Sequence, residues 1–387
     1  MPRPAGALVL HAPGATTLVP LALAAALLPP LLGWISIAPN RLVSPRVVPL
    51  PDALPVLAAA TVYYLALLAA LLCAMRPRLA WLAEAAAVLA LLALAGTVGL
   101  GTAAALPAGN TVARAAPAAG AWLSLLALAL SMAAAAVIRG GTPALPLLIG
   151  FIGLVALSAA GGLDSLSIAR EAAGRAGELR DALASHVALA AAALLLALAM
   201  AVPLSGFALG RPRLETAFLT AASGIQVVPS IALFGLLIAP LAALASAFPA
   251  LRDVGLGGIG PAPAVLGIAA YLVLPLAQGI LSGLRVAPVE LVEAARGQGL
   301  SPAGVLWGLR LPLGAGVMLG ALRLAAVQAV GLATLAALVG GGGLGTLVFQ
   351  GIGQLATDLI LLGTLPVLAL SLAVDAGLAL LARLVPA

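Results

Sequence analysis

The chain has 387 residues, of which 64% are hydrophobic and only 8% charged, and its mean hydropathy is +1.23. No soluble globular domain buries so much apolar surface, so the composition excludes that class and indicates a protein of the lipid bilayer. All 18 basic residues are arginine, the formal net charge is +6, and aromatic residues make up only 3%, which argues against a nucleic-acid-binding face. Because the chain has no lysine, it cannot carry a standard P-loop, and any ATP chemistry must come from a partner.

Runs of about 20 apolar residues predict an all-α membrane protein with ten spanning helices. They lie near 17–37, 52–75, 79–103, 119–138, 143–161, 187–209, 216–246, 262–284, 313–337 and 355–382. The seventh run is too long for one simple crossing. Pro229 and Pro240 inside it predict a kinked or broken helix.

The arginines predict the direction of these spans. With the N-terminus inside, ten arginines fall on the cytoplasmic side and seven outside, and three of the seven share one long segment. This bias predicts a cytoplasmic N-terminus and places the segment 285–312 in the cytoplasm. Removing the first span as a signal peptide would invert the bias, so we expect it to be retained. Trp34, Trp81 and Trp122 fall near predicted span ends, as interfacial aromatic residues do.

Residues 162–186 separate the first five spans from the last five. Apolar residues recur there at helical spacing, and Glu171 can meet Arg175 one turn later, so we expect an amphipathic helix on the outer membrane surface. A contact with a receptor protein is the alternative for this segment. The predicted organisation is an N-terminal extension over 1–161, this segment over 162–186, and a core over 187–387.

The polar segment 285–312 predicts two short helices joined by a hinge. Pro288 suits a first helical position, and Gly299 can adopt the left-handed conformation that ends a helix. Ser301 is then the N-cap and Pro302 the first position of a second helix. We expect this second helix to end at Leu311–Pro312, before the ninth span begins.

Within this segment, three consecutive residues are followed at fixed intervals by a glycine and by a Leu-x-Leu-Pro group. The set is Glu293, Ala294, Ala295, Gly299, Leu309, Leu311 and Pro312. This spacing resembles the EAA loop of ABC-importer permeases, the cytoplasmic element that docks onto an ATPase. Glu-Ala-Ala alone carries no weight in so alanine-rich a chain, and a plain amphipathic loop is the alternative. The complete set in register favours the docking loop.

Around this loop, the chain resembles the permease subunits of osmoprotectant importers, which handle glycine betaine, choline and related quaternary amines. The likeness rests on QVVPS at 226–230, ALFGLLIAP at 232–240, LVGGGGLG at 338–345 and VFQG at 348–351, with a looser match at APNRLVS, 38–44. It is dense over 180–387. The five additional spans resemble a subgroup in which a long permease pairs with a shorter paralogue.

The resemblance implies a type I ABC importer in a bacterial inner membrane. Such an importer has two permeases, here copies or paralogues, two ATPases, and a periplasmic or surface-tethered substrate-binding protein. ATP and magnesium would bind to the ATPase, so this chain is expected to be a transport permease and not an enzyme, with no cofactor of its own. No nucleic acid is expected as a partner.

Several polar or flexible positions are candidates for the translocation pathway. Gln226 and Ser230 flank Pro229 at the predicted helix break, and broken helices commonly line substrate pathways. Polar groups satisfied between helices are an equally good interpretation. Gly340, Gly341, Gly342 and Gly343 predict an outer gate, a receptor contact or a plain flexible loop. Arg323 lies inside the ninth span, and its candidate partners are Asp358, Asp375 and Glu84.

Other chemistries find little support in the sequence. Cys73 is the only cysteine, and His11 and His186 lie far apart, so no spacing predicts a metal site. Aromatic residues are few and unclustered, which predicts no aromatic cage for a quaternary ammonium. The alternatives are the same machinery importing an amino acid or another small solute, a gradient-driven secondary transporter, and a membrane enzyme. Neither of the last two explains the EAA spacing.

Overall fold

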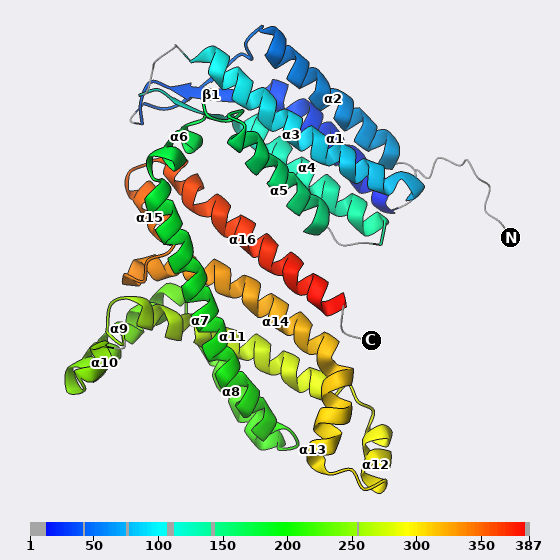
Figure 1. The fold of residues 1–387 in the computed structure, drawn as a ribbon, viewed down its shortest axis with the longest axis vertical. Coiled ribbons are helices and arrows are strands. Elements are labelled where there is room, and N and C mark those ends of the chain that lie inside the picture. The colour runs from blue at the N-terminus through cyan, green and yellow to red at the C-terminus, as the bar shows by residue number, and fades with distance from the viewer. Residues whose placement is uncertain are drawn as a thin grey trace, which may run out of the picture. The chain divides into compact units, whose positions relative to one another are not determined.

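The computed structural model describes residues 13–41, 43–74, 77–106, 112–140, 144–253 and 255–383, and it divides into two units with separate cores (Figure 1). The first unit comprises residues 1–175 and 354–359, and the second comprises 176–353 and 360–387. Arg3, His11 and Arg76 lie outside the described residues.

The first unit is mainly helical. Its elements are α1 (Pro13–Leu32), β1 (Ile35–Ala38), β2 (Arg46–Val48), α2 (Leu54–Ala74), the 3-10 turn η1 (Pro77–Leu79), α3 (Ala80–Ala105), β3 (Arg114–Pro117), α4 (Ala119–Ile138), α5 (Ala144–Ala159) and α6 (Ser167–Gly174). Helix α2 packs against α3, and α1 packs against α4. The strands form a small antiparallel sheet in the order β2-β1-β3, with Ile35 opposite both Val48 and Pro117. This sheet is absent from the all-α prediction, because strands of three or four residues show too little alternation to be recognised.

An aromatic cluster in the first unit corrects the expectation that the aromatic residues lie apart. The ring of Trp34 meets the rings of Tyr63 and Tyr64 edge to face, at centroid distances of 5.6 and 6.0 Å. The two tyrosine hydroxyls donate to the carbonyls of Ala25 and Ala26 in α1. Pro29 and Pro30 follow these carbonyls by four residues, and because proline has no N–H, the helix itself leaves both carbonyls without partners. The tyrosines therefore stabilise a proline-containing helix and do not form an open cage.

The second unit begins within the segment 162–186. Its elements are α7 (Ala176–Ala208), α8 (Pro212–Val227), α9 (Ser230–Ala247), α10 (Ala250–Asp253), α11 (Pro261–Leu284), α12 (Val289–Gly297), α13 (Pro302–Val305), the π turn η2 (Leu306–Arg310), α14 (Leu311–Ala333), the 3-10 helix η3 (Thr334–Val339), α15 (Gly345–Gly353) and α16 (Thr357–Arg383). The first residues of α16 belong to the first unit. The single amphipathic helix expected over 162–186 is wrong: the chain breaks at Arg175, where Gly174 and Gly177 weaken the helix on either side.

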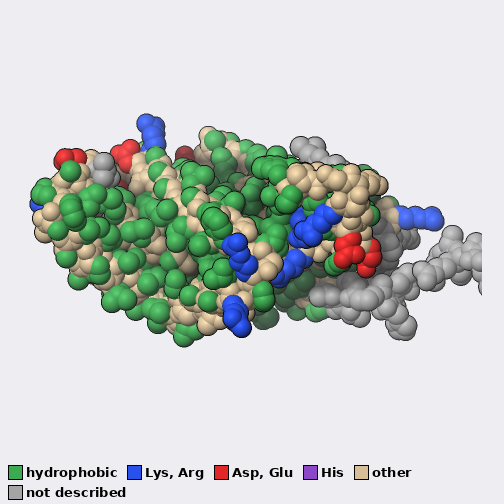
Figure 2. Space-filling model, turned by 90° about the horizontal axis from the view of Figure 1, so that it is seen from below, with side chains coloured by type: hydrophobic (Ala, Val, Ile, Leu, Met, Phe, Trp, Pro, Cys, Tyr) green, Lys and Arg blue, Asp and Glu red, His purple; other side chains and the backbone are tan. Residues whose placement is uncertain are grey.

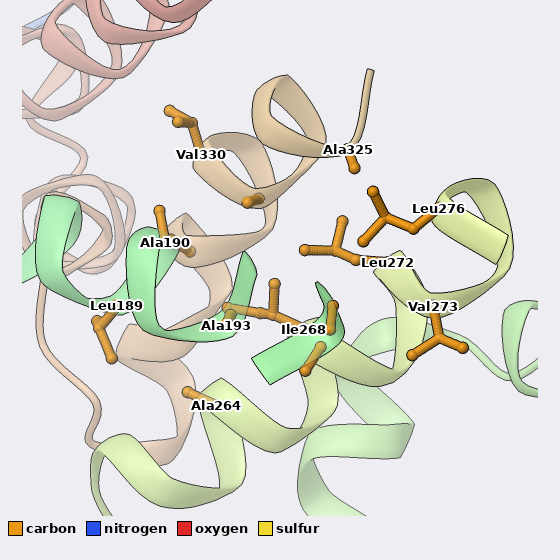
Figure 3. Packing of buried hydrophobic residues seen from close by; sticks show 14 of the residues in the cluster. Leu189, Ala190, Ala193, Ala264, Ile268, Leu272, Val273, Leu276, Ala325 and Val330 are labelled. Carbon is orange, nitrogen blue, oxygen red and sulfur yellow. The ribbon is translucent and has the colours of Figure 1, made fainter. Parts of the chain in front are cut away.

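The core of the second unit is formed by α7, α11 and α14, and it is rich in alanine (Figure 3). Leu189, Ala190 and Ala193 of α7 pack against Ile268 and Leu272 of α11, as do residues of α14. Helices α11 and α14 also meet at Gly283 and Gly314, where a Cβ at 314 would lie 2.1 Å from the Gly283 carbonyl oxygen. Such close backbone approach is the usual way for helices to associate in a bilayer.

Eight helices of the described residues are long and apolar enough to cross a membrane, and Leu18–Leu32 and Leu145–Ala159 are shorter apolar helices. Together they correspond to the ten predicted spans. Figure 2 shows a face of the molecule on which apolar side chains predominate and charged ones are few. The seventh predicted span is broken as expected: α8 ends at Val227, Val228 is extended, and Pro229 precedes α9. Pro240 lies inside α9 without ending it.

Candidate functional site

The loop between α11 and α14 contains the first expected short helix, α12, and the expected start of the second at α13. Helix α12 ends at Gly297, and Gly299 adopts φ +87°, the left-handed conformation that reverses the chain. The Ser301 hydroxyl accepts a hydrogen bond of 3.1 Å from the Gly304 N–H, so Ser301 is the N-cap of α13 and Pro302 its first residue. Pro288 is the N-cap of α12 and not its first residue, one position earlier in the helix than expected.

This loop has a small hydrophobic core of its own. Val292 and Val305 are buried, at 4% and 2% exposure, together with Ala287. Ala295 of α12 and Leu309 of η2 pack against them. Two residues of the EAA set therefore hold the loop together.

The other face of the loop is exposed. The exposed residues include Glu293, Ala294 and Gly299, none of which belongs to the small core, so a partner could contact them. Trp307 is 72% exposed on the same loop, and Leu291 and Leu300 are exposed as well. Sequence reasoning missed Trp307, although a tryptophan inside the polar segment 285–312 is itself a signal of a contact surface.

Two arginines attach the loop to the helices of the second unit. Arg310 donates to the Leu284 carbonyl at the end of α11, at 3.0 Å. Arg285 forms a two-pronged ion pair with Glu215 at the start of α8, and hydrogen bonds from Arg285 lower the pKa of the Glu215 carboxyl. The loop is thus joined to both α8 and α11.

The second loop helix does not end at Leu311–Pro312, which corrects the sequence prediction. It runs from Pro302 through the π turn η2 into α14. The Leu311 N–H bonds to the carbonyl of Leu306, five residues earlier. The wider turn accommodates Pro312, whose ring would clash with the carbonyl four residues earlier in a regular α-helix. Leu311 is half-buried and Pro312 is exposed.

The helix break at Pro229 is joined to α11 by two hydrogen bonds. The Gln226 side chain donates to the Tyr271 carbonyl at 3.0 Å, and the Tyr271 hydroxyl donates to the Val228 carbonyl. Pro275 follows Tyr271 by four residues and cannot supply the N–H that this carbonyl would otherwise accept. Gln226 therefore satisfies a backbone group that proline leaves unpaired, while Ser230 is the first residue of α9.

Arg323 has a defined partner among the three carboxylates considered. It forms a bidentate ion pair with Asp375 of α16, in which Nη2 of Arg323 lies 2.6 Å from Oδ2 of Asp375. Glu84 instead binds Arg139 in the first unit. Asp358 also belongs to the first unit, where it lies within 3.1 Å of Arg114 and joins an ion network that also contains Arg41, Glu171 and Arg175. The predicted Glu171–Arg175 pair is present in this network.

The glycine segment 340–343 forms a structured loop that packs against α7. Gly340 ends η3 with φ +78°, and Gly342 and Gly343 also have positive φ. A Cβ at Gly343 would lie 3.2 Å from Nδ1 of His186, a fully buried residue of α7. Nε2 of His186 lies 3.0 Å from the Val330 carbonyl, whose usual partner, the Thr334 N–H, bonds instead to Gly331 as the helix narrows to 3-10. Nδ1 is buried and has no hydrogen-bond partner among the residues that the structure describes.

Among the described residues, no group of three or more His, Cys, Asp or Glu side chains could hold a metal ion.

Comparisons with known proteins match both halves of the chain. The family model described as "Binding-protein-dependent transport system inner membrane component" matches residues 193–385. The model described as "ABC transporter permease YehY, N-terminal domain" matches residues 12–169.

Three curated permeases illustrate the similarity. The carnitine transport permease protein OpuCB of Listeria monocytogenes is 31% identical, over 50% of this chain and 81% of its own length. The choline transport system permease protein OpuBB of Bacillus subtilis is 30% identical, over 54% of this chain and 88% of its own length. The osmoprotectant import permease protein OsmW of Salmonella typhimurium is 34% identical, over 52% of this chain and 88% of its own length.

Proposed function

This chain belongs to the family of binding-protein-dependent permeases of ABC importers, and on that premise we propose that it imports an osmoprotectant such as glycine betaine across a bacterial inner membrane. ATP would be hydrolysed in trans by an ABC ATPase. A substrate-binding protein would deliver the solute, and a second permease, a copy or a paralogue, would complete the passage. The cargo follows from relatives named for carnitine, choline and osmoprotectant transport.

The observation that carries the proposal is the division of the EAA set into two groups. Ala295 and Leu309 lie in the small core of the loop, and Glu293 and Ala294 lie on its exposed face. A loop that only connected two helices would not need a core of its own. We assign docking of the ATPase to the exposed face, with Gly299, Leu311 and Pro312 setting the direction of the chain before and after it.

In this proposal the loop lies in the cytoplasm, as does the N-terminus. Gln226, Pro229, Ser230 and Arg323 would line the pathway, and Gly340, Gly341, Gly342 and Gly343 would form its outer gate. The hydrogen bond from Gln226 to the Tyr271 carbonyl of α11 supports a hinge at the break, and the positive φ angles of Gly340, Gly342 and Gly343 support a loop that side chains would distort. The chain itself would bind no cofactor.

Affinity purification in mild detergent, with the native neighbouring genes co-expressed, tests the docking assignment. We expect an ABC ATPase to copurify with the wild type and to be lost from Glu293→Arg, because the substitution reverses an exposed charge on the docking face. Asp253→Arg is a matched control, since Asp253 is exposed on α10, outside the loop. Normal copurification and uptake by Glu293→Arg would contradict the assignment. A folded wild type without any ATPase would contradict the ATP-driven importer.

A further inference from the structure

The Arg323–Asp375 ion pair lies within two membrane-spanning helices, and both of its side chains are partly exposed. Arg323 is in the apolar stretch Pro302–Val339, and Asp375 is in Thr357–Ala382. The two side chains are 38% and 28% exposed. Charged groups that face hydrocarbon are costly, so the exposed part of this pair must face water or protein.

Helix α16 carries other polar side chains in line with Asp375. Thr364, Ser371 and Asp375 are separated by seven and four residues, which places them on one face of the helix. The neighbouring face, with Val367, Leu370 and Val374, packs against the core of the second unit. Thr364 is exposed, and its hydroxyl donates to the Ile360 carbonyl at 2.8 Å. The exposed Leu368 lies on the same face between Thr364 and Ser371, so this face is mixed, and its polar part around Ser371 and Asp375 is the part suited to contact with water.

We propose that Arg323 and Asp375 together form a solute site for small zwitterions that carry a carboxylate and a quaternary ammonium. This inference rests on the proposed import function and names the residues that would bind its solute. The solute carboxylate would replace Asp375 on the planar guanidinium of Arg323, which is suited to two-pronged binding of carboxylates. The released Asp375 carboxylate would then face the ammonium charge, which has no N–H to donate and is held by charge alone.

When a zwitterion replaces the internal Arg323–Asp375 pair, every charge still has a partner of opposite sign. This requirement makes the site selective for zwitterions over simple cations. A zwitterion replaces one internal ion pair by two pairs with the solute, so no charge remains unpaired. A cation without a carboxylate, such as choline, would bind Asp375 and leave Arg323 without a partner inside the membrane, which is unfavourable. The intact pair therefore favours glycine betaine or carnitine over choline.

Saturation-transfer NMR on the trimethylammonium protons of the solute tests the site, because it detects weak binding to a purified protein. The permease complex would be reconstituted in nanodiscs, and glycine betaine and choline compared at equal concentrations. We expect the wild type to prefer glycine betaine. Arg323→Gln leaves Asp375 as an unpaired anion and should shift the preference toward choline by about tenfold, the scale of one charged hydrogen-bond partner.

Two further variants complete the test. Arg139→Gln removes an arginine from the Glu84 ion pair of the first unit and should leave the preference unchanged. Arg323→Gln/Asp375→Asn removes both charges but keeps groups that can hydrogen-bond, and it should bind neither solute. If Arg323→Gln weakens both solutes equally, or if the double variant binds like the wild type, the pair is only a brace between helices or a contact with the second permease, and the proposal fails. ATP-dependent uptake by the wild type, measured in proteoliposomes, tests the import function separately.

Discussion

Gly297 and Gly299 predict opposite effects of the same substitution in the docking loop. Gly299 has φ +87°, whereas Gly297 ends α12 outside the left-handed region. Apart from the adjacent residues and the helix's own backbone, a Cβ at either position would meet no atom of the described residues within 4 Å. Steric contact is therefore the same for both, and only the backbone conformation differs.

The expected magnitudes follow from that difference. An alanine held in the left-handed conformation costs about 1–2 kcal/mol, so Gly299→Ala should weaken the loop by that amount. At 1.4 kcal/mol per factor of ten, the affinity for the ATPase should fall about 5- to 30-fold. Alanine at Gly297 favours the helix by up to about 1 kcal/mol, so Gly297→Ala should leave the affinity unchanged or raise it. Gly299→Asn should lie between, because asparagine tolerates the left-handed region better than alanine.

The assay is the affinity of the purified ATPase for the permease in nanodiscs, with amide hydrogen exchange over 289–305 as a measure of the loop itself. The reasoning is refuted if Gly299→Ala binds the ATPase as the wild type does. It is also refuted if Gly297→Ala is as harmful as Gly299→Ala, since the sign of φ would then not be the cause.

Two further predictions concern one buried and one half-buried polar group. His186→Gln can still place an N–H on the Val330 carbonyl, so thermal unfolding should occur near the wild-type temperature. His186→Asn carries its amide on a side chain that is one carbon shorter and leaves this carbonyl without its partner, so it should cost about 1–3 kcal/mol. Equal effects of the two variants would contradict this. Burial raises the pKa of Glu171, but hydrogen bonds from Arg114 and Arg175 and the charge of Arg41 outweigh it and hold that pKa below 4.5. Because the pKa of Glu171 is lowered in the folded state, its carboxylate stabilises that state fully above pH 4.5, and this stabilisation is lost as the pH falls through the lowered pKa. The melting temperatures of wild type and Glu171→Gln should therefore converge as the pH falls in that range. A difference in melting temperature that does not change with pH would refute the assignment.

Features that depend on neighbouring residues were predictable from sequence. The left-handed Gly299, the Ser301 cap and the break at Pro229 each follow from the conformational preference of one residue and its immediate neighbours. The membrane spans follow from long apolar runs. These signals are local and do not depend on how the helices pack.

Features that depend on packing were not predictable. Asp358, Asp375 and Glu84 were equally good partners for Arg323, because the choice depends on which carboxylate lies at the same depth on an adjacent helix. The aromatic cluster joins Trp34 to residues of the next helix, and no spacing in the sequence shows it. The continuous helix through Pro312 depends on a π turn, which sequence patterns do not distinguish from a helix end.

In the proposed importer, that continuous helix would act as a lever. It extends without interruption over 38 residues, from Pro302 to Val339, and so connects the docking loop at one end to the glycine loop at the other. At 1.5 Å per residue its length is about 57 Å, and a tilt of about 5° around the docking end displaces the far end by about 5 Å. A displacement of that size would separate the glycine loop from His186 and admit water to Nδ1. An event at the ATPase would then reach the opposite side of the membrane through one rigid element, without a relay of side chains.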